Sequence, residues 1–282
     1  MYVKKLSYLA KEKRGCKMKP SVLITGAYGG MGKATVKALS ERGFRVFALD
    51  RSVGEAEEDI IPIEADLTNE ESVQSAFSCV SEMTDELYAI VHFAGIYMLD
   101  SLVEMSSEDF ERIFRINLGG AYLVNKLFIP LLKDKSRILI TTSELAPLDP
   151  LPFTGIYAVT KAALDKYAYS LRMELQLKGI FVSVLRAGAV NTGMLGASTD
   201  ALDHFCERTE LYSCNAERFK KIVESVEARR VEPERLAKKV INILDKRKPS
   251  FAYSINRNPL LLLLNVLPKR LQLFAIRQIL KK

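Results

Sequence analysis

Short apolar runs alternate with longer stretches in which apolar residues recur every three or four positions, as far as Arg186. The short runs predict strands of a parallel sheet that is covered on both faces, and the spaced stretches predict helices. Strands are expected at Ser21–Thr25, Phe44–Leu49, Ile60–Glu64, Tyr88–Phe93, Arg137–Thr142, Phe181–Arg186 and near Phe251–Ser254. Helices are expected at Met31–Arg42, Asn69–Met83, Phe110–Leu132, Ile156–Leu177 and Pro233–Lys246. This order predicts an α/β fold, a doubly wound parallel sheet with helices on both faces, in a single domain over residues 21–255.

The composition is that of a globular protein. Of the 282 residues, 48% are hydrophobic and 27% are charged, with a mean hydropathy of +0.04. These values exclude disordered, collagen-like and multi-span membrane proteins. The four cysteines lack paired spacing, so we expect reduced thiols and a cytoplasmic location. The longest apolar run, Leu260–Leu264, is far shorter than the ~20 residues of a membrane-spanning helix.

The net charge of +7 is unevenly distributed along the chain. Residues 1–20 carry a net charge of +6 and residues 246–282 carry +9, whereas the segment between them carries −8. Because a nucleic-acid-reading domain places basic residues on a recognition element within its fold, this distribution argues against a nucleic-acid partner. Residues 1–20 are expected to form a basic arm, or an upstream extension with Met18 as the start, and lysines interrupt any signal-peptide pattern.

A glycine-rich turn joins the first strand to the first helix, with the sequence Thr25-Gly26-Ala27-Tyr28-Gly29-Gly30-Met31-Gly32. Glycines in such a turn let the backbone approach a pyrophosphate, which the free N–H groups of the helix N-terminus then bind. An ordinary glycine-rich turn is the alternative. Dinucleotide contacts are therefore expected at Gly26, Tyr28, Gly30, Met31 and Gly32.

Carboxylates follow the second and third strands. Asp50 ends the second strand, where a carboxylate accepts both ribose hydroxyls of NAD and repels the 2′-phosphate of NADP. The neighbouring Arg51 is placed to bind that phosphate, so NAD is favoured and NADP is the alternative. Asp66 is placed to reach the adenine, and a helix-capping role is its alternative.

Tyr157 and Lys161 are spaced i and i+4, which places both on one face of a helix. Tyrosine has a pKa of about 10 and is a poor base at neutral pH, but a nearby ammonium favours the phenolate. The pair therefore predicts a proton-transfer group. Tyr122 and Lys126 have the same spacing within a long helical pattern, whereas Tyr157 follows a strand that ends in Ser143. We interpret the Tyr122 pair as ordinary helix surface.

The order and spacing of these motifs resemble the short-chain dehydrogenase/reductase family over residues 20–255. The resemblance is carried by Thr25-Gly26-x-x-x-Gly30-x-Gly32, Asp66, Ala94-Gly95, Asn117 in Ile-Asn-Leu, Ser143 and Tyr157-x-x-x-Lys161. It implies a Rossmann-type fold and NAD(P)-dependent hydride transfer between an alcohol and a ketone. It implies that Tyr157 is the general acid/base and that Ser143 hydrogen-bonds the substrate oxygen. Lys161 would bind the nicotinamide ribose and lower the pKa of Tyr157, and Asn117 would hold a water of the proton relay.

Two departures from the family pattern concern cofactor contacts. The usual Asn-Asn-Ala-Gly is His92-Phe93-Ala94-Gly95 here, and the usual Pro-Gly is Ala187-Gly188. His92 is interpreted as a packed or hydrogen-bonded residue rather than a catalytic one. The spacing of His204, Cys206 and Cys214 fits no common zinc pattern, so no metal site is expected. The resemblance places further cofactor contacts at Leu67, Ala94, Gly95, Gly188, Val190 and Thr192.

The stretch after Thr192 resembles the mobile lid of the family and is expected to cover about residues 193–230. An apolar, aromatic lid suits a lipophilic alcohol or ketone, steroid-like or retinoid-like, although the same residues also suit simple packing of the lid helices. The residues concerned are Met194, Leu195, Leu202, His204, Phe205, Leu211, Tyr212 and Phe219. Substrate contacts are expected at Ser143, Tyr157, Met194 and Leu195.

Residues 256–282 are expected to form a basic amphipathic tail. Asn258-Pro259, the leucine run and Leu267-Pro268-Lys269-Arg270 resemble the hydroxysteroid/retinol dehydrogenase branch. Apolar residues among basic ones are typical of a helix that lies on an anionic membrane through residues 259–282, or against a partner subunit. The apolar set is Leu271, Phe274, Ile276, Ile279 and Leu280.

The sequence also bears on the oligomeric state and leaves alternative functions open. By the resemblance, family members commonly pair through helices Phe110–Leu132 and Ile156–Leu177, so a homodimer or homotetramer is expected. A catalytically silent dinucleotide-sensing module would need no set of four catalytic candidates, and a dehydrogenase of a small polar or sugar alcohol would differ in its pocket. An adaptor built on the two basic ends would bind membrane or nucleic acid with a strong salt dependence.

Overall fold

The computed structural model describes residues 19–226 and 230–281, apart from the side chains of 194–199, 225 and 226. The basic arm, with Met18 and Cys16, therefore lies outside the described residues except for its last two positions.

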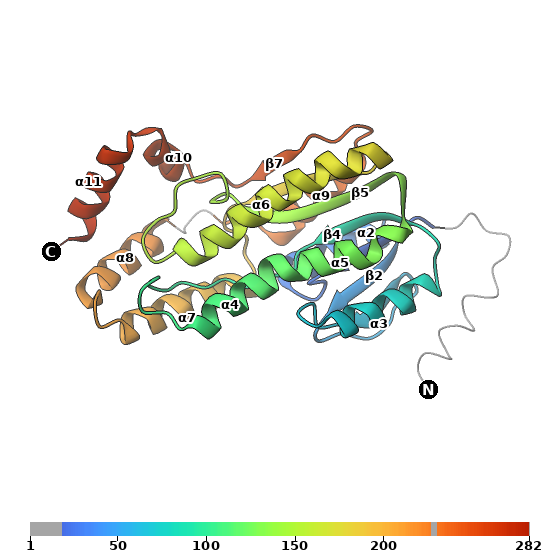
Figure 1. Cartoon of the computed structure of the whole chain (residues 1–282), viewed down its shortest axis with the longest axis horizontal. Coiled ribbons are helices and arrows are strands. Elements are labelled where there is room, and N and C mark those ends of the chain that lie inside the picture. Colours follow the sequence, from blue (N-terminus) through green and yellow to red (C-terminus); the bar gives the residue numbers. More distant parts are fainter. Residues whose placement is uncertain (1–18, 227–229, 282) are drawn as a thin grey trace.

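Seven strands form one parallel sheet in the order β3-β2-β1-β4-β5-β6-β7 (Figure 1). Their bounds are β1 Ser21–Thr25, β2 Arg45–Asp50, β3 Ile60–Glu64, β4 Leu87–His92, β5 Leu132–Ser143, β6 Phe181–Ala187 and β7 Ala252–Ile255. Strand β1 pairs with β2 on one side and with β4 on the other, so the strand order reverses there. In such sheets ligands bind at this reversal, outside the carboxyl ends of the strands. The predicted doubly wound fold is confirmed.

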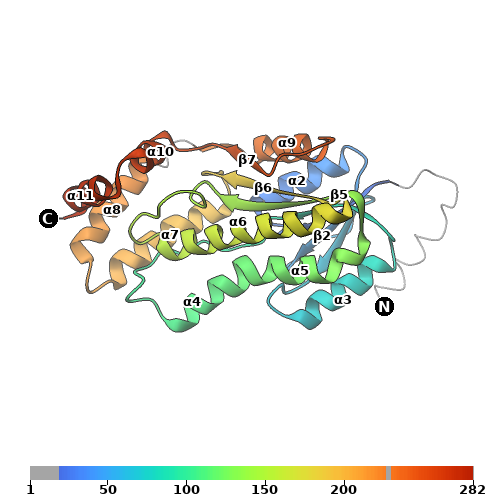
Figure 2. The same ribbon diagram turned by 45° about the horizontal axis from the view of Figure 1, so that its top comes forward.

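Helices cover both faces of the sheet (Figure 2). Helices α2 (Gly30–Ser40) and α9 (Pro233–Leu244) pack on one face. Helices α3 (Glu70–Ser81), α5 (Gly120–Phe128) and α6 (Gly155–Leu175) pack on the other. Each helix follows from an apolar stripe at helical spacing.

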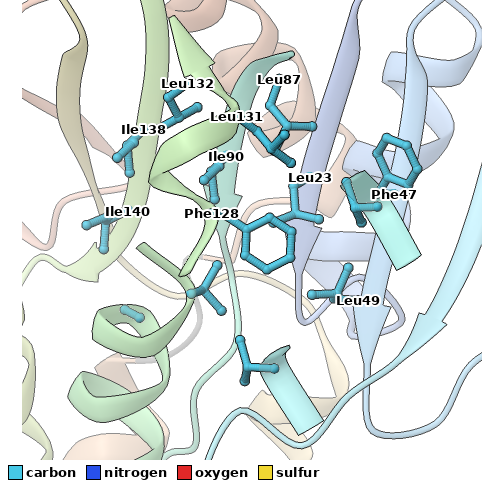
Figure 3. Packing of buried hydrophobic residues seen from close by; sticks show 14 of the residues in the cluster. Leu23, Phe47, Leu49, Leu87, Ile90, Phe128, Leu131, Leu132, Ile138 and Ile140 are labelled. Atoms are coloured by element: carbon cyan, nitrogen blue, oxygen red, sulfur yellow. The ribbon is translucent and has the colours of Figure 1, made fainter. Parts of the chain in front are cut away.

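The core between the sheet and helices α3, α5 and α6 gathers large side chains from several strands (Figure 3). Leu23, Phe47 and Ile90 lie in one fully buried cluster with Phe128 of α5. Full burial of such a side chain contributes roughly 1.5–3 kcal/mol. This packing fixes α5 and α6 against the sheet, and α6 carries two of the catalytic candidates.

The expected helix Phe110–Leu132 is built from several pieces. Helix α4 (Ser107–Phe114) continues into a π-helical turn, η1 (Arg115–Gly119), and then into α5. A 3₁₀ turn, η2 (Ile129–Leu131), follows, because Pro130 lacks the N–H group that would continue the α-helix. Strand β5 then begins at Leu132, earlier than the sequence pattern predicted.

The lid consists of α7 (Gly193–Arg208) and α8 (Ser213–Val226), and η3 (Gln176–Lys178) ends α6. The tail consists of α10 (Pro259–Val266) and α11 (Lys269–Leu280). One expectation for the tail is wrong: Leu280 is buried and Ile276 is half-buried, because the end of α11 packs on α8 and the lid cluster. No helix in the described part of the chain is long and apolar enough to cross a membrane.

Candidate active site

Ser143 is the last residue of β5 and is buried at the carboxyl edge of the sheet. Its Oγ accepts a hydrogen bond from the Leu145 N–H at 3.2 Å, and its hydroxyl interacts with the phenol of Tyr157, which lowers the pKa of Tyr157. Tyr157 lies in the first turn of α6. The end of a strand and the start of a helix therefore bring two hydroxyl groups together.

Lys161 lies one turn further along α6 and is buried. Its Nζ donates to the Thr141 carbonyl at 3.4 Å and lies 5.7 Å from the centroid of the Tyr157 ring. Because burial penalises the charged ammonium, it lowers the pKa of Lys161 to about 8. The side chain is thus poised to gain or lose charge just above neutral pH.

The pKa of the Tyr157 hydroxyl is raised, whereas the family resemblance implied a lowered pKa. Burial raises the pKa of Tyr157 to about 12, and the hydrogen bond with Ser143 opposes this rise only in part. The desolvation of the phenolate therefore dominates the shift of the Tyr157 pKa. The protonated phenol is therefore the resting form of the group in this structure.

Asn117 lies in the wide turn η1, and such π-helical turns are frequent at functional sites. Its Oδ1 accepts from the Ile96 N–H at 2.8 Å, and its Nδ2 donates to the Ile96 carbonyl at 3.0 Å and to Thr160 Oγ1 at 3.2 Å. A Cβ on Gly95 would lie 3.1 Å from Asn117 Oδ1 and 3.4 Å from Lys161 Nζ. Gly95 thus keeps open the space where these two side chains converge.

The glycine-rich turn forms a cradle with no room for side chains. Gly26 has a φ of +66°, and a Cβ there would lie 2.6 Å from the Ala94 nitrogen. A Cβ on Gly32 would lie 2.0 Å from the Gly26 carbonyl oxygen. Helix α2 begins at Gly30 without a side-chain cap, so no capping side chain covers its first N–H groups. This cradle fits the pyrophosphate of a dinucleotide.

Asp50 lies at the end of β2, beside the cradle. Its carboxylate accepts the backbone N–H groups of Tyr28 at 2.9 Å and of Arg51 at 2.8 Å. These bonds tie the cradle to the end of β2 and orient the carboxylate, while the Arg51 side chain stays exposed.

Asp66 follows β3 and organises the turn before α3. Its Oδ1 accepts the Thr68 N–H at 2.9 Å and the Thr68 hydroxyl at 2.7 Å, and these bonds lower the pKa of Asp66. Asn69, rather than Asp66, is the N-cap of α3. The adjacent Leu67 packs on the start of α5, where a Cβ on Gly120 would lie 3.0 Å from the Leu67 Cβ.

The segment after β6 approaches the cradle from the other side. Val190 is buried, and a Cβ on Gly188 would lie 1.9 Å from the Asn256 carbonyl oxygen. A Cβ on Gly30 would lie 2.6 Å from the Thr192 Cβ. The root of the lid therefore touches the start of α2.

The side chains of Met194 and Leu195, at the start of α7, lie outside the described residues. His204 is exposed on the same helix. Across the described residues, no group of three or more His, Cys, Asp or Glu side chains is placed to hold a metal ion.

Two aromatic residues that were not expected from the sequence, Tyr97 and Phe153, pack against the apolar cluster of the lid helices. The Tyr97 ring lies 4.9 Å from the Tyr157 ring between centroids, and Phe153 has a positive φ of 64°. The only sequence signal for Tyr97 is its position two residues after Gly95. Phe153 contacts three lid rings at centroid distances of 4.6–5.5 Å: Phe205, Tyr212 and Phe219.

His92, at the end of β4, is buried and hydrogen-bonded. Its Nδ1 lies 3.4 Å from Thr25 Oγ1 and its Nε2 lies 3.0 Å from Asn125 Oδ1. Asn125 in turn donates to the Tyr167 hydroxyl at 3.1 Å. Burial lowers the pKa of His92 to about 4, so the ring is neutral at pH 7. His92 therefore links β1, β4, α5 and α6.

Comparison with known proteins establishes the family of this chain. A model of short chain dehydrogenases matches residues 20–203, well over half of the chain. The chain belongs to the short-chain dehydrogenase family. This confirms the resemblance drawn from the motifs, and the family is one of NAD(P)-dependent oxidoreductases.

Two sequence relatives and one solved structure are similar to this short-chain dehydrogenase. Mouse estradiol 17-beta-dehydrogenase 2 is 32% identical over 206 residues, which are 66% of this chain and 54% of that enzyme. The chain thus spans about half the length of that relative. A 3-ketodihydrosphingosine reductase of Bacteroides thetaiotaomicron is 26% identical over 267 residues, 92% of this chain and 98% of that enzyme. A Brucella melitensis 3-ketoacyl-(acyl-carrier-protein) reductase complexed with NADH has a TM-score of 0.68 at 22% identity, covering 84% and 96% of the two chains.

Proposed function

We propose that this short-chain dehydrogenase transfers a hydride between a nicotinamide cofactor and a secondary alcohol or ketone, with Tyr157 as the general acid/base. One observation carries the proposal: Ser143, at the carboxyl edge of the sheet, interacts with the Tyr157 hydroxyl, one helical turn from Lys161. The cradle that fits a pyrophosphate opens at the same edge, after β1. A module that only sensed a dinucleotide would have no use for this proton-transfer group.

Each catalytic candidate has a separate task. Bound NAD(P) supplies the hydride donor or acceptor. The hydroxyls of Ser143 and Tyr157 hold the substrate oxygen, and Tyr157 exchanges the proton of that oxygen. The protonated Lys161 beside the ring stabilises the phenolate left when Tyr157 gives up its proton, and it binds the nicotinamide ribose. Asn117 fixes the backbone at Ile96 and, as the family resemblance implies, holds a water of the relay.

We infer NAD as the preferred cofactor. The oriented Asp50 carboxylate supports this preference, because it accepts ribose hydroxyls and repels a 2′-phosphate. The exposed Arg51 supports NADP as the alternative. Side-by-side initial rates with the two cofactors decide between them, since the Asp50 argument predicts the higher kcat/KM with NAD.

The substrate is proposed to be lipophilic. Tyr97 lies against the Tyr157 ring, and Tyr97 and Phe153 both pack against an apolar cluster formed by the lid helices. Burial of apolar substrate area against such rings is favourable, whereas a sugar alcohol would leave its hydroxyls unpaired there. Two relatives are named for estradiol and 3-ketodihydrosphingosine, both molecules with a large hydrocarbon part, which supports this substrate class.

A homodimer or homotetramer is part of the proposal. Exposed apolar side chains line the outer faces of α4, α5 and α6: Phe110, Tyr122, Val159, Tyr169 and Met173. Such a set suits an isologous contact between two copies. Size-exclusion chromatography with light scattering measures the assembly. A cytoplasmic location is also proposed, because Cys79, Cys206 and Cys214 are free thiols.

The test of the reaction is a screen for oxidation or reduction of the nicotinamide by absorbance, against steroids, retinoids, long-chain ketones, sugars and small alcohols. Tyr157→Phe is expected to lower turnover by roughly 10³-fold while nucleotide binding is retained. Tyr122→Phe is the matched control, because it removes the hydroxyl of the other Tyr-x-x-x-Lys pair. Turnover of Tyr157→Phe within a few-fold of the unmodified protein would refute the assignment, and a response to sugars alone would refute the lipophilic pocket.

A further inference from the structure

Helix α10 is apolar around most of its circumference, yet none of its residues is buried. Leu260, Leu263 and Val266 follow one another at helical spacing and are 59%, 64% and 81% exposed. A helix that is hydrophobic on nearly all sides is normally covered by protein or lipid. The body of this protein covers Leu261, Leu262 and Leu264 only in part and leaves the other apolar side of α10 uncovered.

The first two turns of helix α11 show a reversed polarity, whereas its end buries Leu280. These turns bury Gln272 against the body of the protein, where the side-chain amide donates to the Leu267 carbonyl at 2.9 Å. In contrast, Leu271, Leu273 and Phe274 are more than half exposed. Packing of α11 on the fold alone would favour the opposite arrangement, because burying the leucines would remove more apolar surface from water. The outward leucines therefore indicate an external partner.

The exposed residues of the two helices form one docking face, defined here as Leu260, Leu263, Val266, Leu271, Leu273 and Phe274. Basic residues surround this face, and residues 246–282 contain nine Lys and Arg but no Asp or Glu. Arg270 and Arg277 are both exposed on α11. Lys269 pairs with Asp149, and the other charged residues that the tail supplies are basic and without an acidic neighbour in the tail. An apolar face with a predominantly basic border is complementary to a bilayer with negatively charged head groups.

We propose that the docking face binds the surface of an anionic phospholipid bilayer. The face lies in the interface plane, with the leucines in the acyl region and the arginines at the head groups. A protein partner of matching shape would also need an acidic border, whereas anionic lipid meets the apolar and the charge requirement together.

The position of the docking face connects it to the site. Helix α11 packs on α8, and α10 leads into α11 at the same end of the molecule, which also carries the lid (Figures 1 and 2). Leu280 and Ile276 belong to the same apolar cluster as Phe205 and Phe219 of the lid, and Asn215 Nδ2 donates to the Leu280 carbonyl at 2.7 Å. A bilayer under α10 and α11 is therefore adjacent to the lid. If the proposed function holds, a lipophilic substrate reaches the lid from the bilayer.

Flotation of the full chain with vesicles tests the docking. The protein is expected to float with vesicles of phosphatidylcholine and phosphatidylserine, and to float less at high salt or with phosphatidylcholine alone. The double variant Leu263→Asp/Phe274→Asp is expected to bind the anionic vesicles at least roughly tenfold more weakly. Leu177→Asp, which changes a leucine that is 82% exposed in η3, the turn that follows α6, is the control and is expected to float like the unmodified protein.

Two results would overturn the proposal. One is flotation of the double variant equal to that of Leu177→Asp, with circular dichroism showing both folded. The other is a change from dimer to monomer caused by the double variant in light scattering, which would assign the face to a second copy of the chain. Tyr157→Phe is expected to float normally, so a failure of the proposed reaction leaves flotation unchanged, and a failure of docking leaves turnover of a water-soluble substrate unchanged.

Discussion

The catalytic end and the lid end of the site are held in different ways. At the catalytic end, Ser143, Lys161 and Asn117 are buried on a strand, a helix and a π-helical turn, and each bonds to backbone atoms. At the lid end, contacts run mainly between aromatic rings around Phe153. Backbone bonds on regular elements fix an atom within fractions of an ångström, whereas rings repack. In the proposed function, proton transfer therefore depends on the rigid end and substrate choice on the adaptable one.

Two polar contacts fasten the lid to the loop after β4. Arg208 at the end of α7 pairs with the buried Asp100. The Glu104 carboxylate accepts the Thr209 hydroxyl at 2.8 Å and the Glu210 and Leu211 N–H groups at 2.9 and 3.0 Å. These contacts lie where α7 meets α8, so they close the lid at its outer end without touching the catalytic residues.

The largest effect is expected at the rigid end. Lys161→Met should lower kcat by roughly 10³-fold, the range of a lost acid–base group, while Lys126→Met, which removes the lysine of the other pair, should change little. Because the pKa of Lys161 is lowered to about 8, its charge is present at pH 7 and lost as pH rises through 8. The kcat/KM of the unmodified protein should therefore fall above that pH. Absorbance rates measured over a range of pH values give both effects. A kcat of Lys161→Met within tenfold of that of the unmodified protein would contradict a catalytic role of Lys161.

A second experiment measures how the buried His92, which is hydrogen-bonded to Thr25 and Asn125 beneath the catalytic residues, affects stability. The folded pKa of His92 is about 4, below the value of about 6.5 for an exposed histidine, so the unfolded chain binds more protons. Stability is then full above pH 6.5 and declines as pH falls, by roughly 3 kcal/mol at pH 4. His92→Asn, which restores the residue usual in the family, should lose this part of the decline. Urea unfolding at pH 7 and pH 4.5 compares the two proteins, and equal declines would contradict the link.

A smaller effect is expected at the adaptable end. Phe153→Ala removes the ring that joins Phe205, Tyr212 and Phe219, and it should lower the free energy of unfolding by roughly 2 kcal/mol, because the ring is only partly buried. It should raise KM for a lipophilic substrate more than it lowers kcat. Steady-state kinetics of Phe153→Ala and Phe153→Leu separate the effects on KM and on kcat. A fall in kcat with no change in KM would show that the Phe153 cluster acts on the catalytic residues rather than on substrate binding.

The smallest effect is expected at the lid fastening. Backbone hydrogen bonds keep the pKa of Glu104 below its usual value, so the carboxylate is charged throughout the neutral range. Glu104→Gln weakens three acceptor contacts and should raise KM by about two- to fivefold with kcat unchanged. Amide exchange at Glu210 and Leu211 should speed up, and Glu108→Gln on the exposed side of α4 is the control. Unchanged exchange at those amides would show that the lid closes without this contact.

The two ends also differ in how far the sequence predicted them. The sheet, the glycine cradle and the Tyr157–Lys161 pair follow from local patterns, because buried parallel strands are continuous apolar runs and helical spacing fixes which residues share a face. The pKa of Tyr157, the ring of Tyr97 above it and the buried Gln272 depend on tertiary contacts. The spacing of apolar residues in the tail is compatible with burial of either face of α11. We therefore expected Leu280 on the exposed face, although contacts with the lid cluster bury it.

The π-helical turn at Arg115–Gly119 has a consequence for chain length. A helix advances about 100° per residue, and the wide turn accommodates one extra residue between the part of the helix that holds Asn117 and the part that packs Val124 and Phe128 in the core. Deleting one residue here would give a regular helix in which one of these faces points away from its partner by about 100°. The turn therefore acts as a phase offset, and homologous chains that keep both faces are expected to keep the length of this segment even where its residues differ.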